Sequence, residues 1–503
     1  MTKVELAGYN LFDYERELAA RETALLTAAA GAAGVEPADQ LRARGTYFQT
    51  VDGVRTSQRE TEDTHLTERG SRSSRQATRY LVHGLHEYKG KFNPQMARAL
   101  INVVDPTATA LLDPFAGSGT SLVEGMRLGM ATAGIDQNPL AAWVARTKTT
   151  AMTRAGQPGL SKEFDDLAGR ARLAMKEGQD RGTPSRPEFV TPQDAAYLER
   201  WFQPAVLAAV WDALVVCRQQ PGVVADVVEV CLSNIVRQIS WQLPEDLRVR
   251  RRPAGWTPPN VAELFAASAE RGLLAMVETE QAPRLADVPT PQVRCGSSRE
   301  PSTVAQVWPE GRRLVVTSPP YATALPYVDT DRLSIVLMGL APATSLRELD
   351  QALTGSREWS TREAFQWGSN WAEDIEEMPP ELLTLLDIIK ANNDAEGAGF
   401  RRQAVPALLY RYFAYMGQTL AALRASMAEG EKVVMVVGVN RTGSGATATT
   451  IDTPDLLGRL SERHGFHYEE RLPFQAWARY GMHARNAVAS EAAVVMTAAA
   501  TTT

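Results

Sequence analysis

The chain has 503 residues, of which 44% are hydrophobic and 22% are charged, and its formal net charge is −6. A chain of this length and composition can bury a large core and form two or three domains, which argues against global disorder. The acidic balance means that any nucleic-acid partner must be held by local basic patches and not by overall charge.

Cysteine content and apolar segments indicate the cellular compartment in which the protein is expected. Cys217, Cys231 and Cys295 are too few and too scattered for a disulfide framework or a zinc site. The N-terminal MTKVELAGYN lacks the features of a signal peptide, and the apolar run PAVLAAVWDALVVC is broken by Asp212 and too short to span a bilayer. We therefore expect a cytoplasmic protein without a membrane role. His83 and His86 lack the spacing of metal ligands, so we expect no metal.

The first part of the chain combines a helix pattern with polar sequence. Residues 12–33 have the spacing of an amphipathic helix, and the sequence after them is polar and charge-rich, ending in TERGSRSSRQATRY. We therefore expect residues 1–75 to form a helical, charged N-terminal arm.

Strand and helix patterns alternate after Pro94. The order is a helix (PQMARALINVV), a strand (TALLD), a tight loop, a helix (TSLVEGMRLG), a strand (ATAGID) and a helix (PLAAWVARTKT). This alternation predicts an α/β fold with a doubly wound, mostly parallel sheet, whose first half lies in residues 76–150.

Helix patterns fill residues 151–289, where no convincing strand occurs, so we expect an inserted helical subdomain there. The strand pattern resumes in residues 290–497 with RRLVVTSPPY, KVVMVVGVN and SEAAVVMTA. These strands predict the second half of the sheet domain, and residues 498–503 are interpreted as a tail.

The stretch LLDPFAGSGT ends a predicted strand at Asp113 and continues into a tight turn. Gly117 and Gly119 carry no Cβ, so the backbone of this turn can approach a ligand closely. The turn lacks the Gly-Lys-Ser/Thr of a phosphate-binding loop and the full Gly-x-Gly-x-x-Gly of dinucleotide enzymes. Asp136 ends the next strand, where a carboxylate can accept both hydroxyls of a ribose. The set fits a nucleoside without phosphates, although an ordinary strand-to-helix turn explains the glycines equally well.

The second motif, TSPPY, follows the predicted strand LVVT. Pro319 and Pro320 fix a rigid turn, remove two backbone donors and leave carbonyl groups that can accept from a ligand amine. Tyr321 supplies a flat aromatic face. Hydrogen-bond acceptors beside an aromatic ring suit a planar base that bears an exocyclic amine.

Together, DPFAGSGT and TSPPY resemble the cofactor and catalytic motifs of the S-adenosylmethionine-dependent DNA amino-methyltransferases, which modify N4 of cytosine or N6 of adenine. The resemblance implies a Rossmann-like class I methyltransferase fold, with S-adenosyl-L-methionine as cofactor and double-stranded DNA as partner. HEYKGKFNPQMARALI is similar to the motif that precedes the cofactor strand, so Pro94 and its neighbours are expected near the pocket. The implied cofactor-binding residues are Lys91, Phe92, Asp113, Pro114, Phe115, Ala116, Gly117, Gly119, Thr120, Asp136 and Asn138, and the implied catalytic residues are Ser318, Pro319, Pro320 and Tyr321.

The mechanism that the resemblance implies is a direct in-line transfer to an extruded base, without a covalent intermediate. Ser318 and the Pro319 carbonyl would accept from the base amine, and Tyr321 would stack on the base. No cysteine follows a proline in a loop, which argues against cytosine C5 chemistry. Within the family, serine before the two prolines favours cytosine N4, with adenine N6 as the alternative.

Basic and aromatic segments are candidates for contact with nucleic acid. Arg248, Arg250, Arg251 and Arg252 could follow phosphates, and GSREWSTREAFQWGSNW, with Arg357 and Trp359, suits unstacked bases. A solvated charged face, or aromatic packing of a long loop, explains these segments equally well.

The sequence departs from the family pattern at two places. The strand before the catalytic one ends in RCGSS, where Ser297 or Ser298 would replace an aspartate near the cofactor adenine. The helical segment also precedes this strand, so its use in target recognition is a hypothesis.

The wider role is predicted by analogy. We expect a site-specific DNA methyltransferase associated with the nucleoid, acting in restriction-modification or phage defence, with other proteins of such systems as possible partners. The alternatives are an RNA base-amine methyltransferase and a non-catalytic subunit that binds cofactor or DNA.

Overall fold

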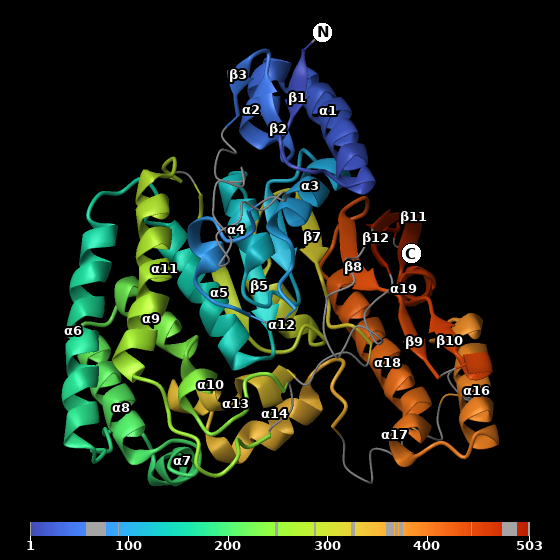
Figure 1. Ribbon diagram of the computed structural model, residues 1–503. Coiled ribbons are helices and arrows are strands. Elements are labelled where there is room, and N and C mark those ends of the chain that lie inside the picture. Colours follow the sequence, from blue (N-terminus) through green and yellow to red (C-terminus); the bar gives the residue numbers. More distant parts are fainter. Residues whose placement is uncertain are drawn as a thin grey trace.

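The computed structural model describes residues 2–56, 77–88, 90–246, 250–285, 288–322, 327–358, 367, 371, 376–443, 445–474 and 490–500. A seven-stranded sheet forms the centre of the molecule, with the strand order β11-β12-β8-β7-β4-β5-β6 (Figure 1). Its strands are β4 (Ala110–Asp113), β5 (Ala131–Asp136), β6 (Gln292–Cys295), β7 (Arg313–Thr317), β8 (Lys432–Gly438), β11 (Phe466–Phe474) and β12 (Glu491–Ala498).

The sheet is mostly parallel, which confirms the predicted Rossmann-like fold class. Neighbouring strands from β6 to β8 pair in parallel, whereas β12 runs antiparallel to both β8 and β11. From β4 the chain moves outward through β5 to β6 and then returns to β7 on the other side of β4. In open α/β sheets, ligands bind beyond the carboxyl ends of the strands where the strand order reverses in this way.

Both faces of the sheet are covered by helices, and successive strand residues face opposite layers. Leu112 and Val315 pack with one layer, and Leu111 and Leu314 pack with the other. The first layer contains α12 (Pro301–Val307), α16 (Pro380–Ala395), α18 (Val405–Arg424) and α19 (Thr453–Arg463); the second contains α1 (Asp13–Ala33), α3 (Pro94–Val104) and residues of α4 (Thr120–Arg127).

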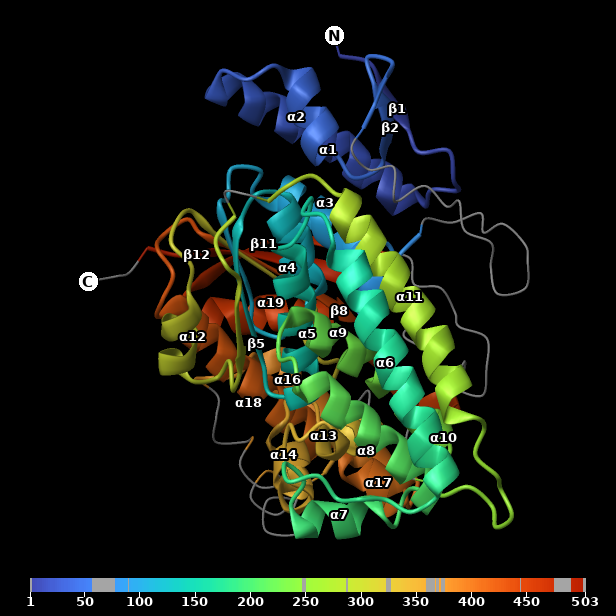
Figure 2. The ribbon, with the colours of Figure 1, turned by 90° about the vertical axis from the view of Figure 1, so that its left-hand side faces the viewer.

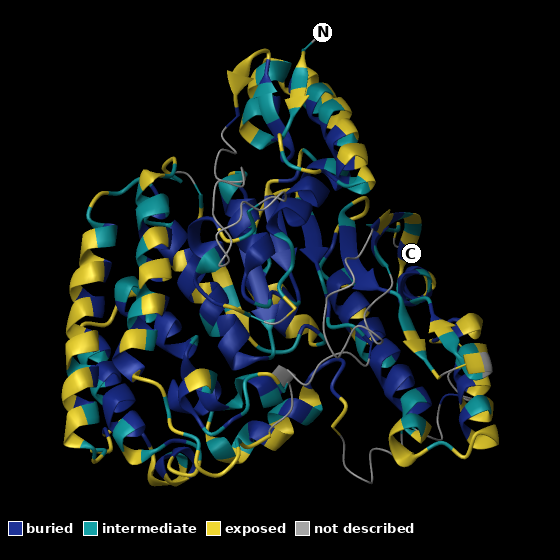
Figure 3. Ribbon diagram, in the orientation of Figure 1, coloured by how far each residue is buried: buried dark blue, intermediate teal, exposed yellow. Residues whose placement is uncertain are grey.

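A helical lobe lies outside α5 (Pro139–Met152), on the left in Figure 1. It packs around Phe164, Trp211 and Phe265, and Figures 2 and 3 show its long helices α6 and α11 running along one side, with exposed residues facing outward. It contains α6 (Leu160–Arg181), α7 (Pro192–Leu198), α8 (Pro204–Arg218), α9 (Val223–Ser233), α10 (Val236–Ile239) and α11 (Val261–Gln281), and it is joined by α13 (Tyr327–Leu337) and α14 (Leu346–Ala352).

Several other described elements are short. They are η2 (Leu81–Gly84), η3 (Ala343–Ser345), α17 (Phe400–Gln403), β9 (Asn440–Thr442), η4 (Gly445–Thr447) and β10 (Thr449–Ile451). No helix within the described ranges is both long enough and apolar enough to cross a membrane.

The N-terminal region is more structured than the predicted arm. The helix expected over residues 12–33 is present as α1, but it is joined by α2 (Pro37–Arg44) and by an antiparallel sheet of β1 (Val4–Leu6), β2 (Phe48–Val51) and β3 (Val54–Arg55). Leu26 and Leu41 are fully buried beneath these elements. Each of these strands is only two to four residues long, too short for its alternation pattern to be recognised in the sequence.

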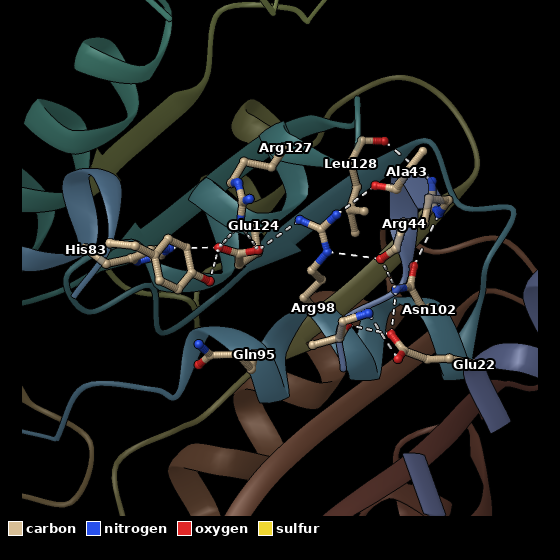
Figure 4. A network of polar contacts seen from close by, with 12 residues as sticks. Glu22, Ala43, Arg44, His83, Gln95, Arg98, Asn102, Glu124, Arg127 and Leu128 are labelled. Atoms are coloured by element: carbon tan, nitrogen blue, oxygen red, sulfur yellow. Dashed lines mark hydrogen bonds and ion pairs between the residues drawn. The ribbon is translucent and has the colours of Figure 1, made fainter. Parts of the chain in front are cut away.

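A buried polar network joins this N-terminal region to the sheet domain (Figure 4). The Arg98 guanidinium of α3 donates to the carbonyl oxygens of Ala43 (2.9 Å) and Arg44 (3.0 Å), and it contacts a Glu124 carboxylate oxygen at 3.4 Å. Glu124 also accepts from the Tyr80 hydroxyl (2.9 Å) and lies 2.8 Å from His83 Nε2.

Glu124 is a charged centre within a buried environment. Burial alone would raise the pKa of its carboxyl, but the hydrogen bond from His83 and the positive charge of Arg98 outweigh burial, so the pKa lies below its usual value. Burial lowers the pKa of His83 to about 4, which keeps the imidazole neutral near pH 7. Arg127 completes the set at 3.0 Å from the Glu124 carboxylate. One carboxylate therefore fixes α3, α4 and the η2 turn together.

Candidate functional site

A pocket lies at the carboxyl ends of β4, β5 and β7, where the strand order reverses. It encloses about 750 Å³, including space open to solvent, which is in the range of small-molecule sites. Its lining consists of Tyr88, Gly90, Lys91, Phe92, Asp113, Pro114, Phe115, Ala116, Gly117, Ser118, Thr120, Asp136, Gln137, Asn138, Ser298, Ser318, Pro320, Leu353 and Thr354.

Most residues singled out from the two motifs meet in this pocket. Among the expected cofactor-binding residues, Gly119 stands outside the lining; it precedes α4 with φ 82°, and a Cβ there would lie 3.0 Å from Ala145. Close packing of α4 against α5 therefore explains this glycine. Of the expected catalytic residues, Ser318 and Pro320 line the pocket, and Pro319 and Tyr321 belong to the same loop. Pro94 begins α3 and does not contribute to the lining.

Asp113 ties the two central strands together at the base of the pocket. Its carboxylate accepts from the Thr317 hydroxyl at the end of β7 (2.6 Å), from the Phe115 backbone N–H (3.0 Å) and from the Ser121 hydroxyl. Burial raises its pKa to about 6, although these hydrogen bonds act in the opposite direction. Asp113 therefore organises the glycine turn and holds β4 to β7.

Asp136 orders the other side of the turn. One carboxylate oxygen accepts from the Gly117 N–H and the other from the Asn138 N–H, each at 2.8 Å. Burial raises the pKa of Asp136 to about 6. Because each carboxylate oxygen has two acceptor sites, Asp136 can still accept hydrogen bonds from ligand hydroxyls.

Asn138 links the pocket to the helical lobe. Its side-chain oxygen caps α5 by accepting from the Leu140 N–H (3.0 Å), while Nδ2 donates to the Asp331 carboxylate of α13 at 2.8 Å. In chain order, α13 follows β7 and the S-P-P-Y residues. The Asn138 amide therefore connects the end of β5 to the helix that follows β7.

Two hydroxyl groups face the pocket without a protein partner. Ser118 Oγ and Thr354 Oγ1 are buried, with residue exposures of 3% and 2%, and neither has a hydrogen-bond partner among the described residues. Buried hydroxyls normally have a partner, so this pair fits a polar ligand. Ser118 lies inside the glycine turn and could have been predicted, whereas no motif marks Thr354.

Other lining residues were outside the predicted set as well. Tyr88 and Gly90 lie within HEYKGKFNPQMARALI, and Gln137 lies between Asp136 and Asn138, so the sequence marked their neighbours. Leu353 carries no motif signal. Ser298, which sequence analysis offered with Ser297 as a substitute for an aspartate, does line the pocket.

Some of the residues predicted to contact nucleic acid lie within the described residues and others lie outside them. Arg248 and Trp359 lie outside the described residues, and Arg357 is exposed after α14. Arg250 pairs with Asp246 at 3.4 Å, and Arg251 lies over the Trp241 ring at 5.2 Å. Arg252 stacks on Trp256 at 4.2 Å and donates to the Ser240 carbonyl at 3.0 Å. Packing within this segment accounts for Arg252, whereas Arg251 and Arg250 remain exposed. Across the described ranges, no group of three or more His, Cys, Asp or Glu side chains has the arrangement of a metal site.

Comparisons with known proteins point to methyltransferases. Residues 85–163 match the family model described as an RMKL-like, methyltransferase domain. The chain is 26% identical over 299 residues to the type II methyltransferase M.MvaI of Kocuria varians, covering 56% of this chain and 63% of that protein. It is 40% identical over 76 residues to the type II methyltransferase M.MjaII of Methanocaldococcus jannaschii, covering 15% of this chain and 14% of that protein. The alignments thus span less than two thirds of either relative.

The matched segment contains β4, α4, β5 and α5, and so includes Asp113, the glycine turn and Asp136. Its position at the reversal of the strand order agrees with a Rossmann-like methyltransferase domain.

Proposed function

We propose that the protein transfers a methyl group from S-adenosylmethionine to the exocyclic amine of a base extruded from double-stranded DNA, with cytosine N4 as the target. The observation that carries the proposal is the meeting of the glycine turn and the S-P-P-Y loop, residues 318–321, at one pocket. The names of the two relatives further support a role as a type II, site-specific methyltransferase, and such a role belongs to restriction-modification or defence.

The cofactor side of the pocket fits S-adenosylmethionine, which supplies an activated methyl group. Asp136 has acceptor capacity left for ribose hydroxyls. The Ser118 and Thr354 hydroxyls, which have no partner among the described residues, can bind polar groups of the ligand. Gly117 has φ 51° and lines the pocket, so the turn approaches a ligand without a side chain in the way.

The base side of the pocket fits an amine donor. Ser318 Oγ donates its proton to the Val436 carbonyl at 3.1 Å, which leaves the oxygen lone pairs to accept from the base amine. Pro319 offers a carbonyl, and neither proline has an N–H that would compete. Acceptors in these positions orient the amine and stabilise the positive charge that develops on its nitrogen during in-line transfer. Tyr321 would stack on the base.

The choice of cytosine as the target depends on Ser318 and on the family resemblance of the motif that contains it. The experiment therefore identifies the modified base directly. Purified protein is incubated with labelled S-adenosylmethionine and either unmodified genomic DNA or total RNA, and the nucleosides are then separated and identified by mass spectrometry. We expect N4-methylcytosine in DNA. N6-methyladenine would correct the target, label in RNA alone would replace DNA as substrate, and binding of cofactor without transfer to either would support a non-catalytic role.

A further inference from the structure

Tyr321 is held by a residue far away in sequence. Its hydroxyl donates to a Glu491 carboxylate oxygen at 2.7 Å, across 170 positions of the chain. Glu491 is the first residue of β12 and pairs with Gly438, the last residue of β8. Because β12 is antiparallel to β8, its first residue reaches the edge of the sheet where the parallel strands end. The reversed strand thereby brings a carboxylate to the S-P-P-Y loop.

The other end of the loop is fixed by β8. Ser318 Oγ donates to the carbonyl of Val436 at 3.1 Å, two residues before the end of that strand. In between, Gly355 has φ 80° and lies against the loop, so that a Cβ there would be 3.2 Å from Pro320 Cβ and 3.3 Å from the Tyr321 carbonyl oxygen. The rigid prolines are thus held from β8, from β12 and from the segment after α14.

We propose that Glu491 is a positioning residue that sets the orientation of the Tyr321 ring for stacking on the target base. The inference rests on the proposed function, because it assigns a role to Tyr321 in that reaction. A phenol that donates to a carboxylate makes a charge-assisted hydrogen bond, which is stronger and more directional than a neutral one. With Glu491 in place the ring holds one orientation before the base arrives, so no ordering of the ring is required during the reaction.

The test compares Tyr321→Phe, Glu491→Ala, Glu491→Gln and the double variant Tyr321→Phe with Glu491→Ala. We expect Tyr321→Phe and Glu491→Ala each to lower kcat about tenfold, as the loss of one hydrogen bond to a charged group predicts. Glu491→Gln keeps an acceptor oxygen and should recover most of kcat. The double variant should be no slower than either single variant, because both changes remove the same interaction.

Controls separate positioning from folding and from the proposed function. Glu469→Ala removes a carboxylate of β11 that bonds Lys432 at 3.0 Å, away from the loop, and should leave kcat unchanged. Calorimetry should give every variant the cofactor Kd of the unmodified protein. Normal kcat in Glu491→Ala, or additive losses in the double variant, would overturn the inference while leaving the proposed function intact. Absence of transfer by the unmodified protein to DNA and to RNA would overturn both.

Discussion

The two sides of the pocket differ in the origin of their supporting contacts. On the side proposed to bind the cofactor, called the cofactor side, Asp136 accepts from the backbone of Gly117 and Asn138, 19 and two positions away. On the side proposed to bind the base, called the base side, Ser318 and Tyr321 bond to Val436 and Glu491, 118 and 170 positions away. The hydrogen bonds of Asp136 thus lie within one continuous segment, although Asp113 beside it also accepts from Thr317 of β7. These hydrogen bonds of the S-P-P-Y loop, in contrast, are made to distant strands, β8 and β12.

This difference has a functional consequence. A local unit can keep its ligand geometry when distant strands are disturbed, whereas the S-P-P-Y loop depends on several of them. The family model matches residues 85–163, which include Gly117, Asp136 and Asn138 of the cofactor side. Changes on the two sides should therefore separate cofactor binding from transfer.

The largest effect on stability is expected from Glu124→Ala, which removes a buried carboxylate from α4, within the segment that carries the cofactor side. The change leaves Arg98, Arg127 and His83 buried without their shared carboxylate. Loss of one partner of a buried charged pair costs about 3–5 kcal/mol, so the free energy of unfolding in urea should fall by that amount, and cofactor affinity should weaken with it. Glu163→Ala, which removes a surface pair with Arg154 at 3.2 Å, is the control and should cost about 1 kcal/mol or less. Equal losses in the two variants would contradict the role of the network.

A smaller and more selective effect is expected from Gly355→Ala, which acts on the base side. The new Cβ would require a strained backbone at φ 80° and would crowd Pro320 at 3.2 Å. We expect kcat to fall while the cofactor Kd stays constant, with a stability cost of about 1–2 kcal/mol. Gly430→Ala is the matched control, because Gly430 has a similar φ of 79° and a Cβ there would meet no atom within 4 Å. It should lose a similar free energy of unfolding through backbone strain while keeping its kcat. A parallel loss of kcat in Gly430→Ala would show that strain alone explains the effect.

A third effect concerns the pH dependence of stability without cofactor. Burial raises the pKa of Asp136 from 3.8 to about 6, so between these values the folded protein binds more protons than the unfolded chain. The contribution of Asp136 to the free energy of unfolding therefore falls as the pH rises through this window, by at most about 1.4 kcal/mol per pH unit. Urea unfolding at several pH values should show a shallower fall in Asp136→Asn. Identical slopes in the two proteins would mean that Asp136 titrates normally.

The same contrast explains how much the sequence could predict. The apolar runs of β4, β5 and β7, the glycine turn and the S-P-P-Y loop are local patterns, and their meeting follows from the rule that ligands bind where the strand order reverses. Glu491 and Thr354 carry no local signal, because the direction of β12 and the path after α14 place them at the site. The contacts of Arg252 could not be predicted for a related reason: its neighbours in space, Trp256 and the Ser240 carbonyl, are not visible in the charge run.

The measurement that tests the division between the two sides most directly is a paired determination of cofactor affinity and methyl transfer for the unmodified protein and Tyr321→Ala. Stacking of a base on an aromatic ring is worth about 1–3 kcal/mol, so transfer should fall about fivefold to 150-fold while the Kd for S-adenosylmethionine stays the same. Transfer at the unmodified rate, or a loss of cofactor affinity equal to the loss of transfer, would contradict the account.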